Sequence, residues 1–144
     1  MTVRPEVVLA RLATLGEMLA VLGGLAGSNA ELRKDPLLRL ALERALHVAA
    51  EAAFDIGHHV LAGRGAPVPA KYREVLPALA SAGIVPAELA ARLAGLAGLR
   101  NVLVHDYARI DHALLWDLVD GRLEDLRGLA HALSELPELR SPPA

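Results

Sequence analysis

The 144-residue sequence contains no cysteine and very few aromatic residues. The lack of cysteine excludes disulfides, thiolate metal sites and a cysteine nucleophile. Aromatic residues make up only 3% of the chain, whereas hydrophobic residues make up 53%. The core must therefore be built from Leu, Ala and Val, a composition that suits close-packed helices. This length allows one domain with a substantial core and is too short for two domains that each bury a core of their own.

Long uninterrupted apolar runs and a strong charge of one sign are also missing. Arg4, Arg11 and Glu17 interrupt the N-terminal segment that could pass for a signal peptide, and no run reaches the roughly 18 residues of a membrane helix. We therefore expect a cytoplasmic protein with no membrane-spanning segment. The formal net charge of −2 and the pI near 6.3 provide no basic field over the whole surface, so any contact with RNA must be local.

The sequence has no glycine-rich phosphate loop, no Gly-x-Ser-x-Gly elbow and no His-Glu-x-x-His zinc motif. His58 and His59 are adjacent and point about 100° apart on a helix, so they do not form a helical zinc pair. Glu51, Asp55 and His59 are spaced so that one cation could touch all three, but such stripes are common by chance. We expect no metal and no cofactor.

Apolar residues recur every three or four positions through most of the chain, and no stretch alternates with period two. The fold class predicted is all-α, an up-and-down bundle of four to five helices. The helices should run over about residues 5–22, 36–61, 71–80, from 86 through the 100–107 segment, and 112–136. We expect a single domain over residues 1–139 and a frayed tail over residues 140–144, and Pro137 should also fray.

Local signals mark the ends of these helices. Gly23-Gly24 should stop the first helix, and Asp35 followed by Pro36 is a strong start signal for the second. Pro77 should bend or shorten the third helix, and Gly121 leaves a break open in the last. On the second helix, the polar residues Arg44 and His47 are interpreted as a solvated flank.

The polar chemistry is concentrated in residues 100–107, Arg-Asn-Val-Leu-Val-His-Asp-Tyr. On a helix, Asn101 and His105 share one face and Arg100 and Tyr107 share another. An amide one turn from an imidazole can fix its tautomer, and an arginine fork suits phosphate oxygens. From spacing alone, however, the favoured interpretation is ordinary: Arg100 and His105 cap and solubilise the C-terminal end of a helix.

This stretch resembles the motif of the HEPN superfamily, and specifically that of the HepT-like branch, ribonuclease toxins that are paired with small nucleotidyltransferase antitoxins. The resemblance covers nearly the whole chain, because the Asp35-Pro36 helix start, residues 51–56, residues 72–76 and residues 100–107 come in the family's order. It implies an HEPN-like helical domain, metal-independent RNA cleavage, a homodimer and a cognate nucleotidyltransferase antitoxin. Because of this resemblance, we favour a functional site at Arg100 and His105 over a role as a simple helix cap.

Metal-independent cleavage of RNA requires few groups, because the 2′-hydroxyl of the RNA attacks the adjacent phosphorus. In the interpretation that the resemblance implies, His105 is the base or acid and Arg100 binds the phosphate. Asn101 holds the imidazole or the ribose, and Tyr107 or Asp106 bounds the scissile site. Asp55 is placed beside the motif, where it could pair with Arg100 or orient a neighbouring donor.

Arg100 and His105 are five residues apart, about 140° around a regular helix, so one straight helix does not aim both at one atom. Either the helix loosens near Val104, or the site is assembled from two chains in a dimer cleft, which is the solution the resemblance favours.

Tyr107 is either a packing aromatic or, as the resemblance implies, a residue to which the antitoxin transfers AMP. The alternative function is a non-catalytic HEPN helical module that binds a nucleotide or its nucleotidyltransferase partner.

Overall fold

The computed structural model describes residues 2–26, 34–105, 110, 115 and 121–140, and every regular element in these residues is helical. The α-helices are α1 (Pro5–Ala26), α3 (Pro36–Gly63), α4 (Val75–Ser81), α5 (Ala87–Arg92), α6 (Leu96–His105) and α8 (Leu123–Ser134), and the 3₁₀ helices are η1 (Tyr72–Glu74) and η3 (Pro137–Arg140). The predicted all-α class is confirmed, and no strand occurs in the described ranges.

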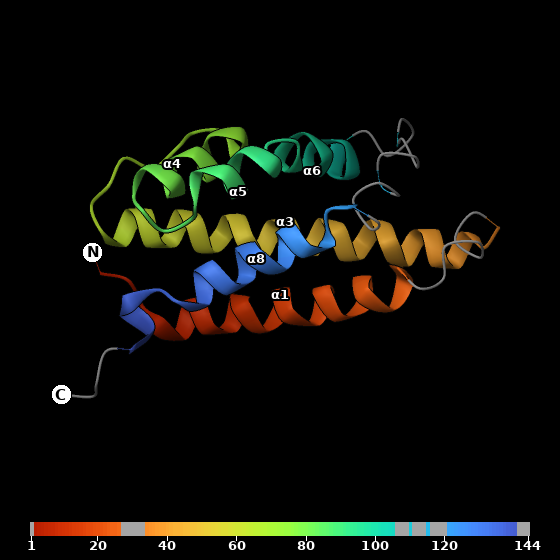
Figure 1. The fold of residues 1–144 in the computed structure, drawn as a ribbon, viewed down its shortest axis with the longest axis horizontal. Helices are drawn as coiled ribbons and strands as arrows, with labels where there is room; N and C mark the ends of the chain where they lie inside the picture. Colours follow the sequence, from red (N-terminus) through yellow and green to blue (C-terminus); the bar gives the residue numbers. More distant parts are fainter. Residues whose placement is uncertain (1, 27–33, 106–109, 111–114, 116–120, 141–144) are drawn as a thin grey trace.

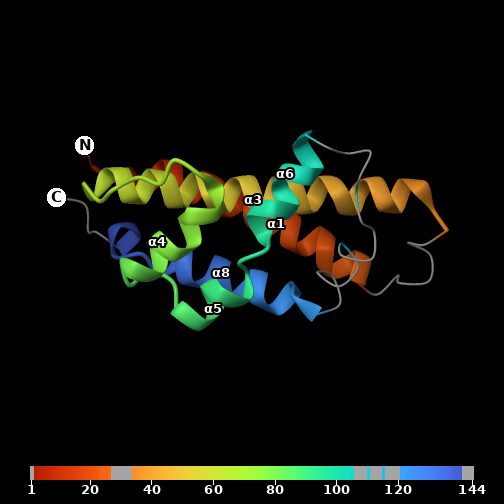
Figure 2. The ribbon, with the colours of Figure 1, turned by 90° about the horizontal axis from the view of Figure 1, so that it is seen from above.

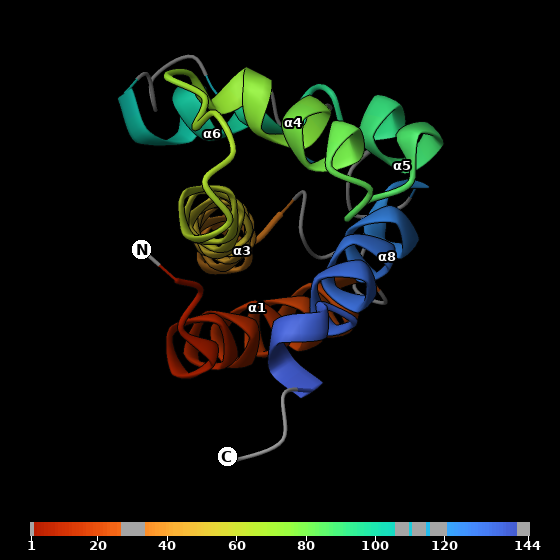
Figure 3. The same ribbon diagram turned by 90° about the vertical axis from the view of Figure 1, so that its left-hand side faces the viewer.

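The long helix α3 lies at the centre of the bundle, and the other helices pack around it (Figure 1). Helix α1 runs antiparallel along one side of α3, while α4, α5 and α6 form a layer on the other side (Figure 3). Helix α8 packs against α1, α3 and α5 and closes the bundle between the two layers. Helix α6 crosses α3 obliquely (Figure 2), so the two helices meet over a limited length.

Helix α3 begins where its local signals predict. The Asp35 carboxylate accepts a hydrogen bond of 2.9 Å from the backbone N–H of Leu37, and Pro36 takes the first helical position, where no N–H is needed. The buried face of α3 carries aliphatic side chains and the fully buried Phe54, the only phenylalanine of the chain. One core of aliphatic side chains joins this face to α1, α4, α5, α6 and α8, and no polar or charged residue of the described part is buried in it.

The first helix does not stop at Gly23-Gly24, so that prediction is wrong. Helix α1 continues to Ala26 because the extra turn buries Leu25, which is 8% exposed. Burying a leucine contributes about 1.5–3 kcal/mol, which offsets the cost of about 1 kcal/mol for a glycine inside a helix. By length and composition α1 is apolar enough to cross a membrane, a feature that the sequence pattern did not indicate; in the fold, its leucine stripe packs on α3 and α8.

The single helix predicted from residue 86 onward is two helices. Residues 93–95 form a turn between α5 and α6, which includes a hydrogen bond of 2.9 Å from the Leu96 N–H to the Leu93 carbonyl. The break lets the two halves of one leucine stripe face different neighbours, since α5 packs on α8 and α6 packs on α3. Similarly, the predicted third helix is η1 followed by α4, and Pro77 lies in the first turn of α4, where proline is tolerated.

The chain does not fray at Pro137. Residues Pro137–Arg140 form η3, and the Arg64 guanidinium donates to both carboxylate oxygens of Glu138, over 2.7 and 2.9 Å. This bidentate contact raises the pKa of Arg64, lowers the pKa of Glu138 and ties η3 to the end of α3. Residues 141–144, the rest of the expected tail, lie outside the described residues.

Candidate active site

The Arg100 side chain is held between α6 and α3. Its Nε donates to Glu51 Oε1 on α3, and the two side chains are only 13% and 27% exposed. Arg100 can reach α3 because the preceding residues of α6, Leu96, Ala97 and Leu99, are buried in the core and fix the helix on the α3 surface. A positive charge is thus retained in a largely desolvated position, because a carboxylate partner compensates for it.

Tyr72 of η1 forms the third side of this site. The Arg100 Cζ lies 4.0 Å from the centroid of the Tyr72 ring, and Arg100 Nη2 donates to the Tyr72 hydroxyl over 3.3 Å. The ring in turn packs on Phe54 and on His58, with centroid distances of 5.2 and 5.8 Å. Three elements, α3, η1 and α6, therefore fix the position of one guanidinium.

Asn101 is exposed, and its Oδ1 accepts a hydrogen bond of 3.1 Å from Arg100 Nη1. This contact differs from the expected one, in which the amide holds the imidazole of His105. With Glu51 and Tyr72, Asn101 completes three contacts to Arg100, one on each guanidinium nitrogen. The terminal nitrogens keep further N–H donors beyond these contacts, so the guanidinium can still bind an anion.

His47 extends the site by one turn of α3. Its Nδ1 lies 3.3 Å from Arg44 Nη1, and its Nε2 lies 3.7 Å from Glu51 Oε1. Burial lowers the pKa of His47, while the Glu51 carboxylate opposes this effect. The interpretation of His47 as part of a solvated flank is therefore wrong, since its side chain is only 24% exposed and it contacts the partner of Arg100. Arg44 is exposed, as expected.

Asp55 does not pair with Arg100. Its carboxylate lies 3.6 Å from Nε of Arg11 on α1, and both side chains are about half exposed. Partial burial raises the pKa of Asp55, and the charge of Arg11 opposes that shift. The acidic partner that sequence reasoning sought for Arg100 exists, but it is Glu51, one turn earlier on α3.

The stripe of Glu51, Asp55 and His59 is not arranged around a cation. Glu51 contacts Arg100, Asp55 contacts Arg11, and His59 Nε2 accepts a hydrogen bond of 2.9 Å from the backbone N–H of Arg4. Across the described residues, no group of three or more His, Asp or Glu side chains is placed to hold a metal ion.

His105 is the last residue of α6, and its side chain is exposed. Helix α6 continues unbroken through Val104, so the alternative in which the helix loosens there is not found. Arg100 is turned towards α3 and His105 is exposed, as their five-residue spacing on a regular helix requires. Asp106 and Tyr107 lie outside the described residues.

These features define an all-helical domain in which one helix carries a buttressed arginine and, five residues on, an exposed histidine. The family model described as Ribonuclease HepT-like matches residues 15–133. The chain therefore belongs to the HepT-like ribonuclease family, which confirms the HEPN-like resemblance and the prediction of an RNA-cleaving enzyme at the level of the family.

A relative from Shewanella oneidensis, the mRNA nuclease HepT, is 24% identical over 120 residues, which cover 83% of this chain and 90% of that protein.

Solved structures share the fold. The tri-AMPylated HEPN toxin of Shewanella oneidensis, in complex with the MNT antitoxin, superposes with a TM-score of 0.81 at 22% identity over 90% of this chain and 98% of that one. YutE of Bacillus subtilis, a cytosolic protein of unknown function, superposes with a TM-score of 0.83 at 20% identity over 100% of this chain and 98% of that one.

Two members of the site were not assigned a role from sequence. Tyr72 lies in the 72–76 segment and Glu51 in the 51–56 segment of the family resemblance, but neither pattern predicts a contact with Arg100. A signal for Tyr72 was present, because a half-buried tyrosine needs a partner for its hydroxyl, and the chain has only two tyrosines.

Proposed function

We propose that this protein is a metal-independent endoribonuclease of a toxin–antitoxin pair, with Arg100 and His105 as its catalytic residues. The observation that carries the proposal is the position of Arg100, which is 13% exposed and held through all three guanidinium nitrogens, on the same helix as the exposed His105. Such fixation is what a phosphate-binding arginine requires, because the donors then need no reorganisation when charge develops on the phosphate. Membership of the HepT-like ribonuclease family supports the same activity.

In the proposed reaction, the 2′-oxygen of a ribose attacks the neighbouring phosphorus while His105 accepts or donates a proton. The bond between phosphorus and the 5′-oxygen of the next nucleotide breaks, and that oxygen leaves as a hydroxyl after it gains a proton. The first product ends in a 2′,3′-cyclic phosphate. Arg100 stabilises the negative charge on the phosphoryl oxygens through its remaining N–H donors. Asn101, Asp55 and Asp106 stay proposed supporting residues, and Glu51 and Tyr72 join them by holding Arg100.

We further propose that the active site is assembled from two chains. Because α6 is regular and Arg100 and His105 point about 140° apart, one chain does not present both groups to a single phosphorus atom. A two-fold homodimer solves this problem by bringing the His105 of one chain near the Arg100 of the other.

The proposed regulator is a cognate nucleotidyltransferase antitoxin that transfers AMP to Tyr107. The similarity to a tri-AMPylated HEPN toxin in complex with an MNT antitoxin supports this. A nucleotide two residues from His105 would add bulk and negative charge, which would obstruct an anionic substrate. We also propose that the protein acts in the cytoplasm, where RNA is present, and without a membrane.

A non-catalytic module that binds a nucleotide or the antitoxin is the second candidate, and one observation favours it: the Glu51 carboxylate already neutralises the charge of Arg100. Incubation of total RNA with the purified protein in EDTA separates the two functions. The nuclease proposal predicts cleavage by the wild type and at least a hundredfold slower cleavage by folded His105→Ala and Arg100→Ala variants, since one such group contributes about 10²–10⁴-fold. Equal cleavage by variant and wild type would contradict the assignment, and no cleavage at all would favour the binding module.

A further inference from the structure

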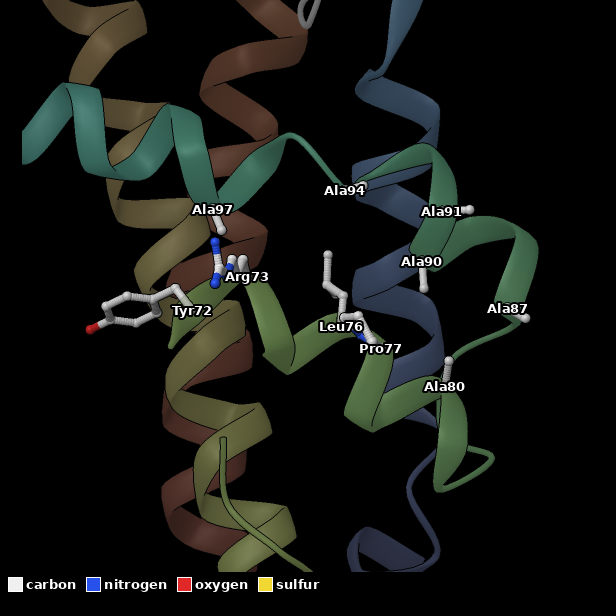
Figure 4. Close-up of a pocket in the computed structure, with 10 residues that line it drawn as sticks. All are labelled: Tyr72, Arg73, Leu76, Pro77, Ala80, Ala87, Ala90, Ala91, Ala94 and Ala97. Atoms are coloured by element: carbon white, nitrogen blue, oxygen red, sulfur yellow. The ribbon is translucent and has the colours of Figure 1, made fainter. Parts of the chain in front are cut away.

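Two adjoining cavities lie beside the candidate active site, between η1–α4 and α5–α6. Figure 4 shows the residues that line the smaller of the two. One has a volume of about 440 Å³ and is lined by Lys71, Tyr72, Arg73, Ala97, Gly98 and Asn101. The other has a volume of about 330 Å³, shares Tyr72, Arg73 and Ala97 with the first, and continues along Leu76, Pro77 and a row of alanines. We call the two together the alanine groove. Each part falls at the size where small-molecule sites begin, about 300 Å³.

The alanine groove is continuous with the Arg100 site. Tyr72 and Asn101, whose polar atoms bond to the Arg100 guanidinium, both line the larger cavity. In Figure 4 the Tyr72 hydroxyl points away from the rest of the lining, so the ring forms an end wall of the groove. A chain of nucleotides whose scissile phosphate meets Arg100 would therefore place a neighbouring nucleotide at the mouth of the groove.

The charge at the mouth of the groove fits an anion. The side chains of Lys71 and Arg73 are exposed and make no ion pair or hydrogen bond within the part of the chain that the structure describes. By contrast, Arg64, Arg92 and Arg127 each contact a carboxylate. No acidic residue is among the described residues that line either cavity. Two cations without carboxylate partners, in an acidic protein, thus face the groove next to the proposed phosphate site.

The wall of the groove fits a flat apolar face. Its sides are formed by alanines of α4, α5 and the turn between α5 and α6, with Leu76 and Pro77 between them (Figure 4). Alanine side chains leave a shallow surface with no hydrogen-bonding groups, on which a nucleobase can lie without sequence-specific contacts. Proteins that bind single-stranded nucleic acid without base preference combine a basic groove along the backbone with aromatic side chains on which bases stack. Tyr72 is the aromatic residue in the lining of both cavities.

We propose that the alanine groove is the subsite for a nucleotide of single-stranded RNA next to the scissile phosphate. Lys71 and Arg73 bind the phosphate of that nucleotide, and the alanine wall accepts its base. This inference rests on the proposed ribonuclease function and specifies its substrate as single-stranded RNA that is bound with little base preference. RNA occupies the groove in preference to a protein segment because both cations at its mouth have no carboxylate partner among the described residues, and because the groove opens onto the phosphate site.

The test is binding of a short fluorescent single-stranded RNA with methylated 2′-hydroxyls, which the proposed reaction cannot cleave. Fluorescence anisotropy is measured over a range of salt concentrations. The Lys71→Gln/Arg73→Gln variant should bind about tenfold more weakly. The slope of log affinity against log salt should fall in magnitude by about 0.7, because Lys71 and Arg73 share one phosphate and each neutralised phosphate of a single strand contributes about 0.7. Arg4→Gln is the matched control, since Arg4 is exposed and precedes α1, on the opposite side of α3 (Figure 3).

A second variant tests the wall independently of charge. Ala91 is exposed on α5 and lines the groove, so Ala91→Leu fills it while keeping a good helix former. It should weaken binding several-fold without changing the salt slope, whereas Ala13→Leu on the exposed face of α1 should have no effect. Circular dichroism confirms that each variant is folded.

The proposal of an RNA subsite is contradicted if the double variant and Ala91→Leu both bind RNA as the wild type does. It is contradicted equally if these variants keep RNA binding and lose only binding of the antitoxin. If the wild type cleaves unmodified RNA under those conditions, the ribonuclease proposal stands without the groove. If the variants lose RNA binding but the wild type cleaves nothing, the groove is supported as an RNA site and the ribonuclease proposal fails.

Discussion

Replacing Glu51 with glutamine tests whether the ion pair of α3 with Arg100 holds the site together. The substitution keeps the size of the side chain and one acceptor oxygen but removes the negative charge. Arg100 is only 13% exposed, and Glu51 is its only carboxylate partner among the described residues. Glu51→Gln therefore leaves a desolvated guanidinium without a counter-charge, which costs more than the loss of an ordinary hydrogen bond.

The size of the effect follows from the exposure of the pair. Removing one partner of a fully buried pair costs about 3–5 kcal/mol, whereas a fully exposed pair contributes about 0–1 kcal/mol. Side chains that are 13% and 27% exposed lie between these limits, and the glutamine oxygen still accepts a hydrogen bond. We expect a loss of about 2 kcal/mol in the free energy of unfolding, which lowers the melting temperature by about 4–8 °C for a chain of this size.

Asp55→Asn is the matched control, because it makes the same chemical change one turn further along α3. Asp55 pairs with Arg11, and the two side chains are 43% and 53% exposed, so solvent screening should reduce the cost to less than about 0.5 kcal/mol. Urea unfolding followed by circular dichroism measures both variants. Equal losses for the two, or no loss for Glu51→Gln, would refute the assignment of Glu51 as the residue that holds Arg100.

Three further predictions follow from other features. If the site is shared between chains, mixing inactive Arg100→Ala and His105→Ala subunits should restore about a quarter of the wild-type cleavage rate, because half of the dimers then carry one intact site; no recovery after subunit exchange would contradict a shared site. Because burial lowers the pKa of His47 in the fold, the unfolded chain takes up this proton first, so stability should fall as the pH drops below the ordinary histidine value of 6.5. His47→Gln should reduce that slope in urea titrations, and an identical slope would contradict the burial effect. Gly57→Ala should destabilise the fold by about 1–2 kcal/mol, because the new methyl would meet a valine methyl of α4 at 2.7 Å; Gly16→Ala, with nothing within 4 Å, should stabilise it by up to about 1 kcal/mol in thermal melts.

Helix α3 could be predicted almost completely from the sequence because its signals are local. Asp35 and Pro36 act on their own first turn, and the spacing of leucines and alanines along the helix determines which face is buried. These signals hold wherever the helix lies in the fold. The all-α class could be predicted for the same reason, because the three- to four-residue spacing of apolar residues does not depend on how the helices are arranged.

The exceptions arose where packing outweighed local preference. Helix α1 continues through Gly23-Gly24 because Leu25 is buried in the core. The leucine stripe from residue 89 to 103 is interrupted at residues 93–95 because its two halves pack on different helices. Neither reason is visible from spacing alone, because each depends on the position of a helix distant in the sequence.

The sequence points to Arg100 and His105 as candidate site residues, but it does not predict which side chains hold Arg100. Glu51 and Asp55 lie one turn apart on the same side of α3, and either could have met Arg100. The choice depends on where α6 crosses α3 (Figure 2), and the structure pairs Arg100 with Glu51. The neighbouring carboxylate of Asp55 instead forms an ion pair with Arg11 of α1.

The measurement that tests the central proposal most directly is the chemistry of the ends made when the wild-type protein cleaves RNA in EDTA. Attack by the 2′-hydroxyl, with Arg100 on the phosphate and His105 moving the proton, predicts new ends that carry a 2′,3′-cyclic phosphate and new 5′-hydroxyls. Both kinds of end should be absent from reactions with the folded His105→Ala variant. Products with 3′-hydroxyl and 5′-phosphate ends, or cleavage that requires a divalent metal, would contradict the account.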